Sequence, residues 1–286
     1  MKLALKNLPP LSPLAPSLLE LSWEDNDAEP RLLRVIESDP ALGARLLATA
    51  NSVGYAAAGA RYTTIISALR RLGLKRAIHL ATSLLFSGPL TKNLPPALGE
   101  ALWLHSLTLA YAAQELARVK RLPEPNSAYF IGLAHDLGYL AMEFLQPGLL
   151  RALADAARRD NLTQEEAELR LFGMDHQEVT VQLLELWNVP EELIVPLRQH
   201  HALELDAESM AAIVFGSEKI ARSAEVAEVV YAGLDHPFMP LTIDRLGIDF
   251  HFAQQLELGS DAVDALTSRI IAQVDSLRAE AAAMTA

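Results

Sequence analysis

Leucine and alanine recur at helical spacing through most of this chain, in segments that proline and glycine interrupt. Both residues are strong helix formers, and neither needs the pleated surface of a sheet. The starts of individual helices are marked as well, because Asp39 precedes Pro40, and Thr163 with Glu166 forms a capping box. The β-branched run at residues 62–66 is short and isolated, and we interpret it as a helix entry. The sequence therefore predicts an all-α protein.

The clearest internal boundary is the proline-rich stretch at residues 88–96. Before it we expect an N-terminal helical lobe over about residues 8–90, and after it a multi-helix bundle over about residues 97–204. The rest of the chain, residues 205–286, is expected to form a C-terminal helical extension. Its tail, residues 261–286, carries one apolar stripe and is predicted to be a single amphipathic segment.

Composition restricts the partners and the compartment. With 36 acidic and 24 basic side chains, the formal net charge is −12, which repels phosphate backbones, so we expect no nucleic-acid partner. Cysteine is absent, which excludes disulfides and thiolate metal ligands and fits a reducing compartment. We find neither a signal-peptide core nor a run of about 18 uninterrupted apolar residues. We therefore expect a soluble, cytoplasmic protein without a membrane partner.

The residues that carry the chemistry are histidines and one aspartate, spread over helical sequence: His105, His135, Asp136, His176, His200 and His201. Imidazole and carboxylate ligands together suit divalent transition ions such as Zn, Mn or Fe. On a helix predicted over residues 128–145, His135 and Asp136 are about 100° apart and can lean toward one bundle interior. The set predicts a site for one or two ions, able to polarise a phosphoryl oxygen and to generate hydroxide. The alternative is that each histidine is buried beside a backbone partner.

Further short motifs stand in a fixed order with these histidines, over roughly residues 8–204. They are Leu8-Pro9-Pro10-Leu11, Asp39-Pro40-Ala41-Leu42, Asn51-Ser52, Ala68 to Gly73 (ALRRLG), Gly132 to Gly138 (GLAHDLG), Glu166, Phe172-Gly173-Met174-Asp175-His176 and Trp187-Asn188-Val189-Pro190. The combination resembles the HD superfamily of metal-dependent phosphohydrolases and, more closely, the HDOD family, the HD-related output domains of bacterial signalling. Together the motifs are far more specific than any one of them.

The resemblance implies an HD-like bundle and a regulatory module without demonstrated catalysis. Compared with the catalytic HD-GYP relatives, which hydrolyse cyclic di-GMP, the chain departs in three places. Tyr139 stands where those enzymes place a lysine for the phosphate, and residues 202–204 lack the glycine-tyrosine-proline loop. Glu218 aligns with the final aspartate ligand, which adds Glu218 to the predicted ligand set, although its longer arm changes the geometry.

Other polar residues receive structural interpretations. His79 is expected to be a hydrogen-bonded core residue. Glu165 and Glu168 could add a carboxylate to the site, but we place them on the surface. A basic cluster is interpreted as a solvated helix face, although it could instead dock an anionic ligand, an acidic partner or nucleic acid. This cluster comprises Arg70, Arg71, Lys75 and Arg76.

These observations favour a cytoplasmic bacterial signal-transduction module of the HDOD type. We expect it to act through contacts with signalling proteins, with a ligand or metal in the His/Asp pocket biasing its conformation. The alternative is a metal-dependent phosphohydrolase that acts on a nucleotide or cyclic dinucleotide. The partners considered are therefore signalling proteins and a small phosphorylated ligand, and the cofactor considered is one or two divalent transition ions.

Overall fold

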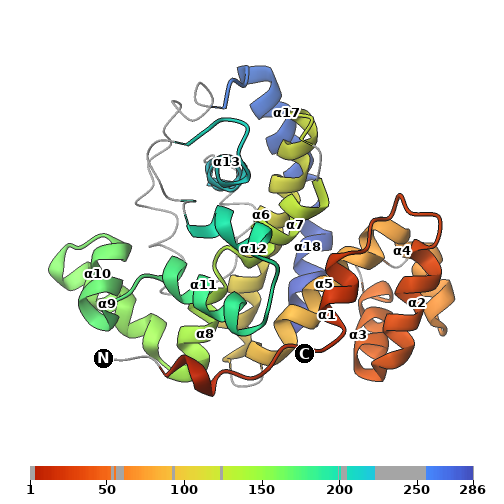
Figure 1. Cartoon of the computed structure of the whole chain (residues 1–286), viewed down its shortest axis with the longest axis horizontal. Coiled ribbons are helices and arrows are strands. Elements are labelled where there is room, and N and C mark those ends of the chain that lie inside the picture. Colours follow the sequence, from red (N-terminus) through yellow and green to blue (C-terminus); the bar gives the residue numbers. More distant parts are fainter. Residues whose placement is uncertain are drawn as a thin grey trace.

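Helices make up all the regular structure in the part of the chain that the computed structural model describes (Figure 1). That part comprises residues 4–52, 55, 61–91, 94–122, 125–198, 200, 205–222 and 256–285. The prediction of an all-α fold is confirmed. None of the helices in these ranges is long and apolar enough to cross a membrane.

The N-terminal part of the chain forms a series of helices, and one of them starts at the predicted cap Asp39. Asp39 Oδ1 accepts hydrogen bonds from the backbone N–H groups of Ala41 and Leu42, both at 3.0 Å, and so starts α3 as expected. Gly73, with φ of +78°, separates the last two helices of this part of the chain. The elements are η1 (Leu5–Asn7), α1 (Ala15–Leu19), α2 (Ala28–Ser38), α3 (Pro40–Ala50), α4 (Ile65–Leu72) and α5 (Leu74–Thr91).

The centre of the molecule is α6 (Pro96–Val119), which is buried on nearly all sides and packs against α7 (Pro125–Ala134). Gly132 allows these two helices to approach closely, because a Cβ atom there would lie 2.8 Å from the carbonyl oxygen of Leu109. In Figure 1 the pair stands between a group containing α2, α3 and α4 and a group containing α9 and α10. The core therefore runs through the middle of the molecule.

The helix predicted over residues 128–145 is divided in two, and this corrects the sequence interpretation. α7 ends at Ala134, and α8 (Leu137–Leu145) begins after a break at His135 and Asp136. The carbonyl of His135 accepts a hydrogen bond from Thr180 Oγ1 at 3.2 Å, whereas the N–H of Tyr139 bonds to the carbonyl of Asp136. A contact from a distant helix thus replaces the regular helical bond at this position.

The rest of the bundle surrounds this break. The capping box of Thr163 and Glu166 is present at the start of α10, as predicted. One α-turn and a 3₁₀ turn follow Pro190. The elements are α9 (Leu149–Asp160), α10 (Gln164–Phe172), α11 (His176–Leu186), α12 (Glu191–Ile194) and η2 (Val195–Arg198).

The C-terminal extension covers the N-terminal lobe as well as the bundle. It contains α13 (Met210–Arg222), α17 (Ser260–Ile271) and α18 (Val274–Thr285), so the predicted single amphipathic tail is two helices. α18 packs on α3, α5 and α6. Arg45 of α3 donates hydrogen bonds to the carbonyls of Ala283 and Met284 at the end of α18. The last helix therefore joins the two halves of the molecule.

Candidate metal centre

Five of the seven predicted metal ligands converge on one buried site from separate elements. His105 lies on α6, His135 and Asp136 form the break between α7 and α8, His176 begins α11, and His200 follows η2. All five residues are buried, with between 0% and 6% of the surface of each residue exposed. Residue type, spacing and the resemblance to the HDOD family thus predicted five side chains that the fold brings together.

Two close approaches set this geometry. A Cβ atom at Gly138 would lie 2.2 Å from the carbonyl oxygen of His176 and 2.8 Å from Thr180 Oγ1. Only glycine allows the start of α8 to lie against the first turn of α11. The N–H of Gly138 also donates to Thr180 Oγ1 at 2.8 Å. Gly138, the second glycine of the GLAHDLG motif, thus fixes the distance between the Asp136 and His176 backbones.

Asp136 is the centre of the cluster, because its two oxygens face different histidines. Oδ2 lies 3.2 Å from His105 Nε2 and 3.1 Å from His135 Nε2, and Oδ1 lies 3.5 Å from His176 Nε2. Two sets of potential ligand atoms, each within 4.8 Å of one another, share this aspartate: His105, His135 and Asp136 form one, and Asp136, His176 and His200 the other. A carboxylate shared in this way can bridge two ions.

Hydrogen bonds to the second ring nitrogen orient three of the imidazoles. His135 Nδ1 donates to the carbonyl of Gly132 at 2.8 Å, and His200 Nδ1 donates to that of Leu197 at 2.8 Å. His176 Nδ1 lies 2.8 Å from Glu168 Oε2. Backbone carbonyls and carboxylates are the usual partners of metal-binding histidines, and they leave Nε2 to bind the ion. This donor set fits a divalent transition ion such as Zn, Mn or Fe.

The sequence interpretation missed the burial of Glu168 at this site and the hydrogen bonds that join it to Tyr139. Glu168 was placed on the surface, but it is fully buried and binds both the N–H and the ring of His176. Tyr139 donates to Glu168 Oε1 at 2.5 Å and also contacts His176 Nδ1 and Gln164. Helical spacing offered a signal, since Glu168 stands one turn before the buried Phe172.

The remaining two predicted ligands have different outcomes. Glu218 lies on α13, is 3% exposed and is close enough for its charge to raise the pKa of His135. It does not belong to either set of ligand atoms found among the described residues. His201 lies outside the described residues. Their roles as ligands stay predictions.

Electrostatics in the cluster raise the pKa values of His135 and His176 and so favour their protonated forms when no cation is bound. Burial opposes the charge on Asp136, but His135 and His105 outweigh it and hold the pKa of the carboxyl well below its usual range. Burial also lowers the pKa of His176, yet Glu168 and Asp136 together raise it to about 9. A bound ion therefore has to displace protons from this site, which makes its binding weaker at lower pH.

Glu168→Gln is expected to lower the pKa of His176 and to flatten a pH dependence of stability. The folded-state pKa of His176, about 9, lies above its ordinary value of 6.5, so the metal-free protein is stabilised below pH 6.5 and loses this contribution as the pH rises through about 9. The contribution is on the order of 3 kcal/mol. Urea unfolding in the presence of a chelator at pH 6 and pH 10 would measure it.

The matched control is Glu165→Gln, the same change on the exposed side of α10. It is expected to leave the pH dependence as it is in the unaltered chain. If Glu168→Gln and Glu165→Gln gave the same unfolding free energies at both pH values, Glu168 would not be what charges His176.

Comparisons with known proteins agree with this architecture. The family model of the HDOD domain matches residues 8–203. The fold is shared with a signal-transduction protein, so assigned, from Marinobacter aquaeolei VT8 (TM-score 0.75, 23% identity, 99% of this chain and 60% of that one). It is also shared with an HDOD domain protein of unknown function from Geobacter sulfurreducens (TM-score 0.65, 24% identity, covering 94% of this chain and 93% of that one). A protein from Shewanella amazonensis SB2B that is assigned as a phosphohydrolase has a TM-score of 0.65 at 21% identity. The match covers 99% of this chain and 96% of that one.

Among curated proteins, an uncharacterised protein of Treponema pallidum (strain Nichols) is 27% identical over 173 residues. The match spans 60% of this chain but only 33% of that protein, so the chain corresponds to about a third of its relative. At these identities the solved structures establish the HD-like helical fold. Because the family model matches more than half of the residues, the chain belongs to the HDOD domain family.

Proposed function

We propose that this protein is a bacterial, cytoplasmic signalling module of the HDOD type whose His/Asp cluster binds one or two divalent transition ions. The observation that carries the proposal is Asp136, buried between two histidine groups with one carboxylate oxygen toward each. When bound, the ions supply positive charge that polarises phosphoryl oxygens. The protein's own residues orient the imidazoles, exclude water and balance the charge.

The buried, hydrogen-bonded hydroxyl of Tyr139 favours a regulatory role over catalysis. This residue takes the place of a phosphate-binding lysine, and its hydroxyl is buried and hydrogen-bonded to Glu168 and His176. It therefore offers no cation to a phosphate group. In this proposal, ion binding sets the relative positions of α6, α8 and α11, and protein partners respond to that arrangement.

Elemental analysis of the full chain, purified without chelator, tests the metal. We expect about one or two equivalents of Fe, Mn or Zn per chain. A content near zero, unchanged after incubation with each ion, would contradict the proposal. A pulldown with the metal-loaded and the chelator-treated chain then tests the regulatory part, which predicts a partner retained by only one of the two forms.

The second candidate, a metal-dependent phosphohydrolase, is favoured by the same bridging carboxylate, which suits a two-ion site. It predicts that the metal-loaded chain hydrolyses bis(p-nitrophenyl) phosphate or cyclic di-GMP. Turnover that disappears with the metal would establish this candidate instead of the regulatory one.

A further inference from the structure

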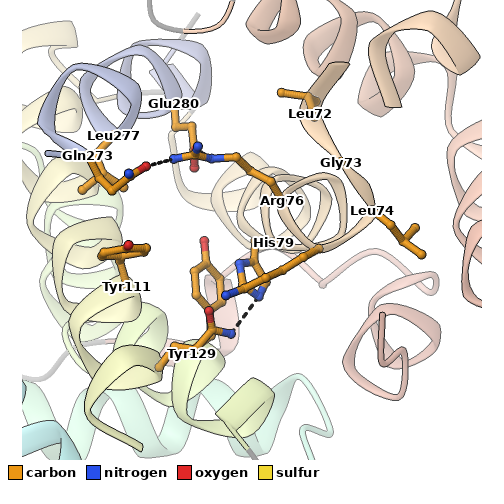
Figure 2. A pocket seen from close by; sticks show the side chains of 12 residues that line it. Leu72, Gly73, Leu74, Arg76, His79, Tyr111, Tyr129, Gln273, Leu277 and Glu280 are labelled. Atoms are coloured by element: carbon orange, nitrogen blue, oxygen red, sulfur yellow. Dashed lines mark hydrogen bonds and ion pairs between the residues drawn. The ribbon is translucent and has the colours of Figure 1, made fainter. Parts of the chain in front are cut away.

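A cavity of about 380 Å³ lies between α5, α6 and the C-terminal helices, apart from the metal centre (Figure 2). None of the residues that line it belongs to the His/Asp cluster. Arg76 and His79 come from α5 and Tyr111 from α6, whereas Leu277 and Glu280 come from α18. One wall therefore lies inside the HDOD match and the facing wall lies beyond it.

Arg76 supplies a half-buried positive charge to this cavity. Its Nη2 donates to Gln273 Oε1 at 2.6 Å, and its Nε lies 3.6 Å from Glu280 Oε1. Glu280 is buried and is also hydrogen-bonded by Tyr55, and burial raises the pKa of its carboxyl to about 8. Burial thus favours the neutral form of this carboxyl, which balances the guanidinium charge less than a carboxylate would. This corrects the interpretation of Arg76 as part of a solvated helix face.

Gln114 supplies a second polar group. It lines the cavity and is fully buried, with its Nε2 donating to His79 Nε2 at 3.0 Å. His79 is held in turn by stacking on Tyr129, with ring centroids 3.7 Å apart, so its prediction as a hydrogen-bonded core residue is confirmed. Gln114 Oε1 has no hydrogen-bond partner among the described residues. A buried amide oxygen without a partner is costly, and a ligand with a donor group would satisfy it.

Lys75 adds a second basic side chain to the lining, and most of the other lining residues are apolar or aromatic, among them Leu72, Leu74, Leu277 and Tyr111. A flat apolar body can pack between such side chains while polar atoms at its ends reach Arg76 and Gln114. The volume lies within the range of small-molecule sites, about 300–1,000 Å³. The cavity thus combines a cation, a buried acceptor and flat walls.

We propose that this cavity binds a small organic anion with a planar ring, whose acidic group pairs with Arg76 and whose ring donor bonds to Gln114. A nucleoside monophosphate and an aromatic carboxylic acid share this chemistry. Because the facing wall is α18, the bound molecule would fasten the C-terminal helix to the HDOD domain. The cavity would then be an input site that is separate from the metal centre.

The dye 1-anilinonaphthalene-8-sulfonate, a planar ring system with an anionic group, is a direct probe of the full chain. Its fluorescence titration is expected to give about one site per chain. Arg76→Gln is expected to weaken binding at least about tenfold, because a charge-assisted hydrogen bond is lost. Leu277→Trp, which fills the cavity, is expected to abolish it. Arg70→Gln removes the same charge from an exposed position outside the cavity and should leave binding unchanged.

Competition identifies the natural class of ligand. Displacement of the dye by GMP indicates a nucleotide, and displacement by benzoate indicates an aromatic acid. If neither displaces it, or if Leu277→Trp binds the dye like the unaltered chain, the proposal is overturned. Circular dichroism establishes that each variant is folded, and Leu277→Trp alone decides the question if Arg76→Gln does not fold.

Discussion

Replacing Asp136 with asparagine is expected to remove metal from both halves of the His/Asp cluster at once. The carboxylate is common to the two sets of ligand atoms, with Oδ2 toward His105 and His135 and Oδ1 toward His176. An amide has the same shape but lacks the charge, and its nitrogen cannot bind an ion. We expect the affinity for each ion to fall by at least about 100-fold. Losing a residue that only hydrogen-bonds to a metal ligand already lowers metal affinity by about 10-fold to 100-fold, and Asp136 is itself a predicted ligand.

The measurement is the metal content of the variant after gel filtration, alongside that of Asp155→Asn. Asp155 is an exposed residue of α9, so this second variant makes the same chemical change away from the cluster. Its metal content is expected to equal that of the unaltered chain. If Asp136→Asn retained one full equivalent, the carboxylate would serve one ion only, and the assignment of Asp136 as a bridge would be wrong.

Replacing Gly138 with alanine is expected to destabilise the fold and to displace His176 from the cluster. The added Cβ would lie 2.2 Å from the carbonyl oxygen of His176, which is backbone and cannot rotate away. The start of α8 and the first turn of α11 must therefore move apart. Overpacking of this kind costs on the order of 3 kcal/mol. Urea unfolding of the metal-free chain gives the loss of stability, and metal titration gives the effect on the site.

Gly259→Ala is the matched control for this substitution. Gly259 has φ of −74°, and no heavy atom lies within 4 Å of the position that a Cβ would take. Its cost is expected to stay below about 1 kcal/mol, with unchanged metal affinity. Equal effects of the two substitutions would show that the close approach of α8 and α11 is not what positions His176.

Helix starts and breaks were predictable because they depend on interactions within a few residues. The side chain of Asp39 bonds to backbone groups two and three positions ahead, and Thr163 and Glu166 bond reciprocally over one turn. Gly73 and Gly173 adopt positive φ at the ends of α4 and α10, where glycine interrupts the helical spacing. Such signals lie in the local sequence, so the all-α class followed from them.

The break at His135 and the burial of Glu168 could not be predicted in this way. Thr180, which takes the carbonyl of His135, is separated from it by 45 residues, and no local pattern marks that contact. Glu168 is an acidic residue, and its burial is made favourable by Tyr139 and His176, which come from other helices. The same limit applied to Arg76, whose partners Gln273 and Glu280 come from the far end of the chain.

The sequence by itself determined the helical class, the helix caps and the kinds of ligand atom, because each depends on residue type and on spacing along one helix. Only the tertiary structure decided which side chains meet: the sharing of Asp136 between two histidine groups, the charge on His176, and the cavity between α5 and α18. The physical reason is that burial and ion pairing arise between elements. Their free energies depend on distances that no single helix fixes.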